Sequence, residues 1–303
     1  MKNTRSLRRR AVGLIAASVL IFSACGSDSS SSDTTAPSAE NALKIVSLSP
    51  TATEMLYAIG AGDQVVAVDS LSTYPAQVAP KVTKISAYEP SAEAILAYEP
   101  DVVLISNDMN KITEQLTTAD PEIKVWTGAA AASIDDVYKQ IAELGELTGR
   151  AEAAAEVVAG MKERIDAAVP DESNLVAFPV YYELDNTYYS VTSNTFVGAL
   201  LKQFGLISIA DGVEEGNDYP QLSAEAIVAA DPDVIFLADT KCCQQTAATV
   251  AARPGWSDIS AVKDGNVVEL DDDVASRWGP RIVDLIEQFA AAHKSMLEKN
   301  AAK

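Results

Sequence analysis

SAEAILAYEPDVVLIS, residues 91–106, and SAEAIVAADPDVIFLA, residues 223–238, are near-copies of one stretch. Nine of their sixteen positions are identical without a gap, and every matched pair lies 132 residues apart. Solenoid repeats recur every ~20–50 residues, so a repeat this distant has another origin. We infer two lobes of similar construction, each carrying one copy.

Each copy predicts a short helix followed by a buried strand. Ser91 and Ser223 are good helix N-caps, and Glu93 and Glu225 then fall in the first turn, where a carboxylate favours the positive helix end. The runs DVVLI and DVIFL are apolar throughout, which is typical of a strand covered on both faces. Each Glu has a simple explanation in stabilising its own helix, but its presence at matched positions favours a shared role.

The remaining chain alternates strand and helix patterns, which predicts an α/β fold with mostly parallel sheets. Ser133 with Asp136 predicts a capping box, and Asn194 is the predicted cap of a later helix. A helix from residue 150 to about 169 spans roughly 30 Å, long enough to connect two lobes rigidly. The predicted strands are 43–48, 64–68, 82–86, 101–105 and 123–126 in the first lobe, and 175–182, 233–237 and 266–270 in the second.

Composition indicates a globular chain: 303 residues, 48% hydrophobic and 22% charged, with a formal net charge of −20. Five basic residues and no acid precede residue 25, so the rest of the chain carries 18 basic against 43 acidic residues. A surface this acidic repels phosphate backbones, which argues against nucleic-acid binding.

Residues 1–24 have the pattern of an export signal, with Arg8, Arg9 and Arg10 before the apolar run AVGLIAASVLIFSA. The following Cys25 resembles the acylated cysteine of bacterial lipoproteins, and cleavage without lipidation is the alternative. Residues 25–42 are rich in Ser and Thr and are predicted to be a flexible tether. The expected location is outside the cytoplasm, at the cell membrane, held by a lipid anchor on Cys25.

The folded part then resembles a known family. The stretch IVSLSPTATEMLYAIGAGDQVVAVDSLSTYP, the paired SAEAI…PDV segments and the close AVKDGNVVELDDDVASRWGPRIVDLI are similar to the substrate-binding proteins of ABC importers. The resemblance is to the helical-backbone group that binds cobalamin, ferric siderophores or haem, and it covers residues 43–298. It implies an N-terminal lobe (43–149), a connecting helix (150–170), a C-terminal lobe (171–303) and a ligand cleft between the lobes.

The resemblance also implies partners and cargo. In cobalamin-binding members, one Glu per lobe docks on arginines of the two-fold permease, and these positions match Glu93 and Glu225. A carboxylate on each lobe suits a symmetric partner through charge-assisted contacts. We expect the cargo to be a cobalamin-type corrinoid carried as ligand, with no cofactor. A ferric siderophore or haem is the alternative, haem taking Tyr182 or Tyr188 as a ligand.

Ligands of parallel α/β sheets sit beyond the carboxyl ends of the strands. This places the expected cleft residues just before each repeat and just after its strand, with Tyr88 and Tyr219 standing where cobalamin binders carry aromatics. Glu183 is a further candidate wall residue. The expected ligand-binding set is Tyr88, Ser106, Asn107, Asp108, Tyr182, Tyr188, Tyr219, Lys241, Cys242, Cys243, Arg277 and Trp278.

Cys242 and Cys243 are adjacent, and disulfides persist outside the cytoplasm. A vicinal disulfide forming an apolar patch in the cleft is one interpretation, and two reduced thiols are the other. A structural zinc site is excluded on ligand count, because His293 is the sole histidine. A secreted hydrolase, the remote alternative, lacks a Gly-x-Ser-x-Gly motif and would need paired carboxylates ~5–10 Å apart, which residues on different lobes do not provide.

Overall fold

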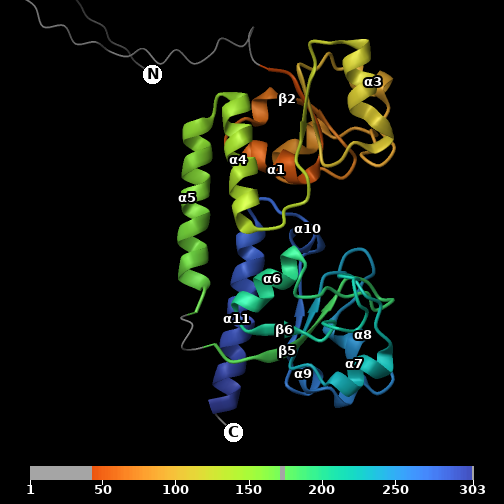
Figure 1. The fold of residues 1–303 in the computed structure, drawn as a ribbon, viewed down its shortest axis with the longest axis vertical. Helices are drawn as coiled ribbons and strands as arrows, with labels where there is room; N and C mark the ends of the chain where they lie inside the picture. Colours follow the sequence, from red (N-terminus) through yellow and green to blue (C-terminus); the bar gives the residue numbers. More distant parts are fainter. Residues whose placement is uncertain (1–42, 171–174, 302–303) are drawn as a thin grey trace, which may run out of the picture. The chain divides into compact units, whose positions relative to one another are not determined.

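A computed structural model describes residues 43–170 and 175–301, which form two α/β lobes (Figure 1). Each lobe contains a four-stranded, all-parallel sheet, in the order β2-β1-β3-β4 and β6-β5-β7-β8. The two orders are equivalent strand for strand, with β1 and β5 pairing with two neighbours each. The predicted signal segment, Cys25 and tether lie outside the described residues.

The first lobe contains strands β1 (Ile45–Leu48), β2 (Val65–Val68), β3 (Val102–Ile105) and β4 (Lys124–Thr127), helices α1 (Pro50–Ala58), α2 (Ala92–Leu96) and α3 (Ile112–Ala119), and 3-10 turns at Gly62–Gln64, Ala76–Lys81 and Met109–Lys111. The second contains strands β5 (Phe178–Glu183), β6 (Leu206–Ser208), β7 (Val234–Leu237) and β8 (Val267–Glu269), helices α6 (Phe196–Gln203), α7 (Ala224–Ala230), α8 (Ala247–Ala251), α9 (Ser260–Lys263) and α10 (Asp272–Ala275), and a 3-10 turn at Trp256–Asp258.

Three longer helices join the lobes: α4 (Ile134–Thr148), α5 (Ala151–Ala168) and α11 (Ile282–Ala301). Helix α5 packs against α4 at one end and against α11 at the other (Figure 1). The capping box predicted for Ser133 and Asp136 is confirmed, and Gly149 ends α4 in the left-handed conformation, with φ +69°. Helices α4 and α5, which follow each other closely in the chain, therefore form a continuous support for both lobes together with α11.

The repeated stretch forms the same unit in each lobe. Ser91 and Ser223 cap α2 and α7 as predicted, each accepting a hydrogen bond from the backbone N–H three residues later. The strands that follow, β3 and β7, are buried at every position. Successive side chains of β3 point to opposite faces of the sheet, and both faces are covered. Val102 and Leu104 enter the core shared with the long helices, whereas Val103 and Ile105 pack under α2 and α3.

One hydrophobic core runs through both lobes. It includes side chains of α1, α4, α5, α11 and both sheets, such as Leu56, Leu144, Ile165, Phe236 and Phe289. Burying side chains of this size contributes roughly 1.5–3 kcal/mol each. Because the core is continuous across α4, α5 and α11, the lobes are held together by apolar packing as well as by the chain.

Three details differ from the sequence predictions. Residues 82–86 are not a strand: only Val82 forms an isolated bridge, to Val68. Strand β6 was missed, because three residues are too few to show a period. The cap of α6 is Thr195, whose Oγ1 accepts from the Gly198 N–H at 3.0 Å, and not Asn194. A Cβ on Gly198 would lie 2.0 Å from the Thr192 carbonyl oxygen, so glycine is required where this helix starts.

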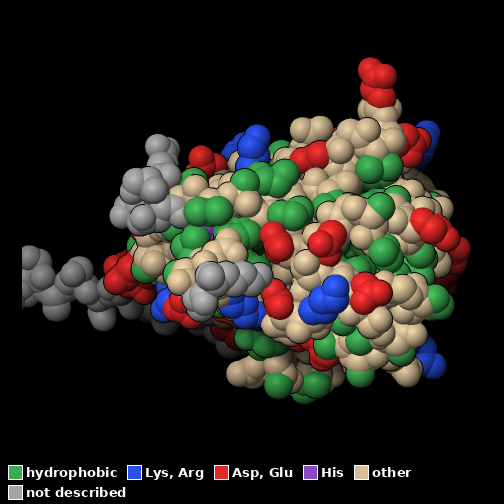
Figure 2. Space-filling model, turned by 90° about the horizontal axis from the view of Figure 1, so that it is seen from below, with side chains coloured by type: hydrophobic (Ala, Val, Ile, Leu, Met, Phe, Trp, Pro, Cys, Tyr) green, Lys and Arg blue, Asp and Glu red, His purple; other side chains and the backbone are tan. Residues whose placement is uncertain are grey.

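On the face that Figure 2 shows, acidic side chains are spread among other residues, with Lys and Arg between them. Within the described part of the chain, no helix combines the length and the apolar character needed to cross a membrane.

Candidate functional site

Two adjoining cavities form the candidate site. The first, of about 420 Å³, lies at the carboxyl ends of β1, β2 and β3 in the first lobe. The second, of about 200 Å³, lies between Ala130–Ala131, the end of β5 and the start of α6. Ser276, Arg277 and Trp278 line both cavities. This position beyond the strand ends is where parallel α/β folds bind ligands.

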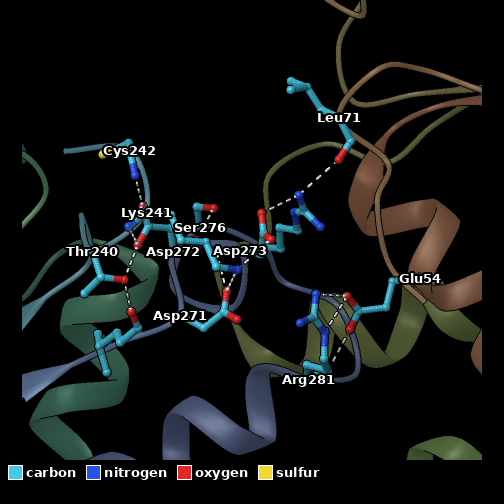
Figure 3. Close-up of polar contacts among 12 residues, drawn as sticks. Glu54, Leu71, Thr240, Lys241, Cys242, Asp271, Asp272, Asp273, Ser276 and Arg281 are labelled. Atoms are coloured by element: carbon cyan, nitrogen blue, oxygen red, sulfur yellow. Dashed lines mark hydrogen bonds and ion pairs between the residues drawn. The ribbon is translucent and has the colours of Figure 1, made fainter. Parts of the chain in front are cut away.

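Residues 271–281, here called the bridging segment, connect the lobes at this point (Figure 3). The segment follows β8 of the second lobe, yet its side chains Arg277, Trp278 and Arg281 bond to the first. Arg277 Nη2 donates to the Leu71 carbonyl at 3.1 Å, and Trp278 Nε1 donates to Gln140 Oε1 at 3.1 Å. Arg281 forms an ion pair with the buried Glu54, with Nη2 2.8 Å from Oε2.

The first cavity contains an acid and a base with unused hydrogen-bonding atoms. Asp69 is fully buried, and its Oδ1 accepts from the Ser72 N–H at 2.8 Å. Its Oδ2 and the Arg277 Nη1 have no hydrogen-bond partner among the described residues. Burial raises the pKa of Asp69, opposed by hydrogen bonds from Ser72 and by the charge of Arg277. Both atoms are shielded from solvent, so the cavity offers this acceptor and this donor to a ligand only once its lining side chains move aside.

Six of the expected ligand-binding residues line these cavities. Tyr88, Ser106 and Asn107 line the first, Tyr219 lines the second, and Arg277 and Trp278 line both. Tyr88 and Tyr219 each lie a few residues before the repeated stretch of their lobe and are 66% and 53% exposed, so each ring is free to contact a ligand. Ser106 Oγ donates to Ser49 Oγ at 2.8 Å, which fixes that wall.

The other expected aromatic and acidic residues lie elsewhere. Tyr182 is fully buried in the core and packs against Phe236 at 6.2 Å, because both faces of β5 are covered. Tyr188 packs against Trp256 at 5.7 Å, on the far side of β5. Asp108 is exposed and accepts the Thr113 N–H at 2.9 Å, at the start of α3.

Glu183, the further candidate wall residue, is fully buried below the loop that follows β7. Arg253 binds it in a bidentate fashion, with both N–O distances 2.6 Å. Asp239 is also fully buried, and both of its carboxylate oxygens lack a partner among the described residues. Burial and the charge of Glu183 raise the pKa of Asp239 to about 7. Such a carboxyl pair binds a proton near neutral pH.

Lys241, Cys242 and Cys243 border the bridging segment but do not line either cavity. Lys241 Nζ pairs with Asp271 and Asp273, at 2.6 and 3.0 Å. The backbone N–H of Cys242 donates to Asp272 Oδ2 at 2.8 Å. Both cysteines are free thiols with sulfur atoms 2.7 Å apart. The aspartate triplet is thus occupied by protein donors, and the described residues contain no cluster of three or more ligating side chains suited to a metal ion.

Glu93 and Glu225 are both exposed, each in the first turn of its helix. The helices α2 and α7 have equivalent places in the two lobes, each preceding an inner strand of its sheet. The two acids are therefore presented by matching, rigid elements.

The sequence analysis missed Asp69 and Ser276 among the cavity residues. Asp69 directly follows the strand VVAV, as Ser106 follows VVLI, so the strand-end rule would have found it. Ser276 carries no such signal, because it reaches the cavity as part of the bridging segment.

Comparisons with known proteins agree with this geometry. The sequence family described as "Periplasmic binding protein" matches residues 45–274. A cobalamin-binding protein of Halobacterium salinarum is 36% identical over 259 residues, covering 82% of this chain and 69% of that protein. The ABC transporter substrate-binding lipoprotein YvrC of Bacillus subtilis is 33% identical over 256 residues, covering 82% and 78%. The periplasmic haem-binding protein HutB of Vibrio cholerae has a similar fold, with a TM-score of 0.70 at 22% identity, covering 84% and 98%.

Proposed function

Because the chain belongs to the periplasmic binding protein family, we propose that it is the extracytoplasmic receptor of an ABC importer and that its cargo is a cobalamin-type corrinoid. The two-lobed fold, with cavities beyond the strand ends, supports a receptor role. The relatives named above are a substrate-binding lipoprotein of an ABC transporter, a cobalamin-binding protein and a haem-binding protein. The identity of the cargo rests on the polar atoms in the first cavity.

The proposal rests on two residues that line the same cavity, Asp69 and Arg277. Asp69 Oδ2 and Arg277 Nη1 each lack a hydrogen-bond partner among the described residues. A primary carboxamide supplies N–H donors for the carboxylate and a carbonyl oxygen for the guanidinium at the same time. The edge of a corrinoid carries several neutral carboxamides of this kind. A carboxylate, as on haem or on many siderophores, satisfies Arg277 but meets Asp69 as a like charge, which is unfavourable in a buried site.

The apolar walls suit a large, flat ligand. Tyr88 and Trp278 line the first cavity, and Tyr219 and Trp278 line the second, so aromatic side chains stand on both sides of the bridging segment. Aromatic rings bury large apolar areas against such a face. Haem held by a tyrosine ligand is less well supported, because Tyr182 is buried in the core and Tyr188 lies outside both cavities.

Quenching of intrinsic fluorescence tests the cargo, since three Trp and ten Tyr give a strong signal. We expect saturable, tight binding of cyanocobalamin and weak binding of haemin and ferric siderophores. Asp69→Ala should weaken cyanocobalamin binding about tenfold or more, since a hydrogen bond to a charged group contributes ~1.5–3 kcal/mol. Asp108→Ala, an exposed acid outside the cavities, is the matched control.

A second series of ligands tests whether the side-chain amides of the ligand, and not only its size, determine its affinity. Cyanocobalamin derivatives with one side-chain amide hydrolysed to a carboxylate should bind more weakly, and Asp69→Asn should recover part of that loss by removing the repulsion. If haemin binds more tightly than cyanocobalamin and Asp69→Asn changes neither affinity, the corrinoid proposal is wrong.

Delivery depends on Glu93 and Glu225 in this proposal, through contacts with arginines of a two-fold permease. The acids lie outside both cavities, so Glu93→Ala with Glu225→Ala should abolish uptake without changing ligand affinity. Glu122→Ala, an exposed acid in the turn before β4, is the control. Undiminished uptake by the double variant would remove these residues from the docking surface.

Anchoring at the membrane is proposed through acylation of Cys25, in keeping with the B. subtilis relative being a lipoprotein. Metabolic labelling with a fatty-acid analogue should mark the wild-type chain but not Cys25→Ser. An unlabelled wild-type chain released into the medium would indicate cleavage without lipidation.

A further inference from the structure

Cys242 and Cys243 form a thiol pair on the loop between β7 and α8. The sulfur atoms lie 2.7 Å apart, and Cys242 is exposed to solvent while Cys243 is half-buried. Only a small adjustment of the backbone is needed to bring the two sulfurs to bonding distance. An oxidant in solution can reach the pair through Cys242.

The loop is fixed on both sides of the pair. Ahead of it, the N–H groups of Lys241 and Cys242 donate to the Asp272 carboxylate, at 3.0 and 2.8 Å (Figure 3). Behind it, the Cys243 carbonyl accepts from Gln245 Nε2 at 2.9 Å, while the Cys243 N–H donates back to the Asp239 carbonyl at 3.2 Å. These bonds hold the two thiols side by side and also tie them to helix α10 of the bridging segment.

A chain of ion pairs leads from the loop into the first cavity. Lys241 Nζ is 3.0 Å from Asp273 Oδ2, and Asp273 Oδ1 accepts from Arg277 Nη2 at 2.7 Å. Arg277 lines both cavities. A change in the backbone at residues 241–243 is therefore passed to a cavity wall through two direct contacts.

We propose that Cys242 and Cys243 are a redox-sensitive pair that closes to a vicinal disulfide when it meets a low-molecular-weight disulfide. One protein thiol loses its proton and attacks a sulfur of the oxidant, which releases one thiolate. The second protein thiol, also deprotonated, attacks the mixed disulfide and releases the second thiolate. The two protons end on the released thiols, so two protein S–H bonds and one S–S bond are exchanged for one protein S–S bond and two S–H bonds.

The disulfide that forms is readily reversed. Adjacent Cα atoms are about 3.8 Å apart, below the ~4.4–6.8 Å usual for a disulfide, and strained disulfides are more easily reduced. Partial desolvation of the exposed Cys242, the neighbouring thiol of Cys243 and nearby aspartates raise the pKa of Cys242 to about 12. The exchange should accordingly be slow at neutral pH and accelerate as pH rises, because the thiolate is the nucleophile.

The consequence for the cleft rests on the proposed function. Closing the ring constrains the peptide between Cys242 and Cys243 and shifts Lys241, which moves Asp273 and Arg277. The affinity for cyanocobalamin should then differ between the two states by about fivefold or more, a typical coupling between two sites.

Peptide mapping of the full chain tests the chemistry. After treatment with oxidised glutathione and alkylation under native conditions, the tryptic peptide 242–263, which contains both cysteines and not Cys25, should be lighter by two hydrogen atoms and carry no alkyl group. Dithiothreitol should restore two alkylation sites. Cys243→Ser should instead retain one glutathione on Cys242. Two alkylated thiols after oxidation, or a glutathione adduct in the wild type, would overturn the proposal.

Ligand titrations of the oxidised and reduced protein test the coupling. Equal affinities would overturn the link from the loop to the cavity, even with the ring formed. Lys241→Met should abolish the difference between the two states while leaving ring formation intact. If the ring forms but neither state binds cyanocobalamin, the cargo assignment fails and the thiol pair stands.

Discussion

The ion pair between Glu54 and Arg281 should be the most sensitive polar contact between the lobes. Glu54 lies in α1 of the first lobe and is 3% exposed. Its carboxylate accepts from the Arg281 backbone N–H at 3.0 Å and from Arg281 Nε at 2.9 Å. The same guanidinium stacks 3.7 Å above the Tyr74 ring. Glu54→Gln keeps the shape and one acceptor but removes the charge.

Breaking a buried ion pair by removing one partner costs about 3–5 kcal/mol, because the other charge stays buried. Arg281 is 18% exposed, and its stacking on Tyr74 remains, so the lower end applies. We expect Glu54→Gln to lower the free energy of unfolding by about 3 kcal/mol. For a chain of this size that corresponds to a fall in Tm of roughly 6–12 °C.

Urea titration monitored by tryptophan fluorescence, together with thermal scans, measures the effect. The matched control is Glu287→Gln, which removes an acid from Arg164 in a pair whose side chains are 48% and 45% exposed. Exposed ion pairs contribute ~0–1 kcal/mol, so Glu287→Gln should change the free energy of unfolding by about 1 kcal/mol or less. Similar losses in the two variants would refute the reasoning that burial of the pair, and not the presence of a charge, determines its contribution.

Three further predictions concern proton binding, backbone packing and the spacing of the lobes. The folded state raises the pKa of Asp239 from 3.8 to about 7, so it holds a proton that the unfolded chain releases, and stability should fall as pH rises from about 4 to about 7. Urea titrations across this range should show the slope in the wild type and a flatter one in Asp239→Asn. Gly198→Ala should lower the free energy of unfolding by about 1–3 kcal/mol through its clash with a backbone carbonyl; the same measurement on Gly160→Ala, which has nothing within 4 Å, should show a small gain. Spin labels at Glu93 and Glu225 should show a distance that changes by less than about 2 Å on adding cyanocobalamin; a larger change would contradict a rigid connection.

The repeated stretch is the part of the fold that the sequence specified most completely. A cap, a first-turn acid and a fully apolar strand appear in both copies, and each is a local feature that a single segment encodes. Ser91 and Ser223 could be recognised as caps because the cap uses only its own side chain and the next turn. The α/β class and the two similar lobes followed from the same pattern.

Features that depend on distant contacts were not accessible from the sequence. Tyr182 was expected at the cleft, but only the pairing of β5 with two neighbours shows that its ring points into the core. Strand β6 is three residues long and exists because β5 pairs with it. The contacts of Arg277 and Arg281 with the first lobe join residues more than 200 positions apart, for which local spacing gives no signal.

The bridging segment explains how one molecule can be both rigid and responsive. The continuous core through α4, α5 and α11 holds the lobes at a fixed spacing, because opening it would expose large side chains such as Phe289 to water. Arg277 and Trp278 instead line both cavities, and their hydrogen bonds to Leu71 and Gln140 are polar. Such contacts rearrange at lower cost than a packed core. If the proposed function holds, ligand occupancy should alter the rim of the cleft while the acids at the two helix starts keep their separation. A permease that distinguishes loaded from empty receptor should then contact that rim.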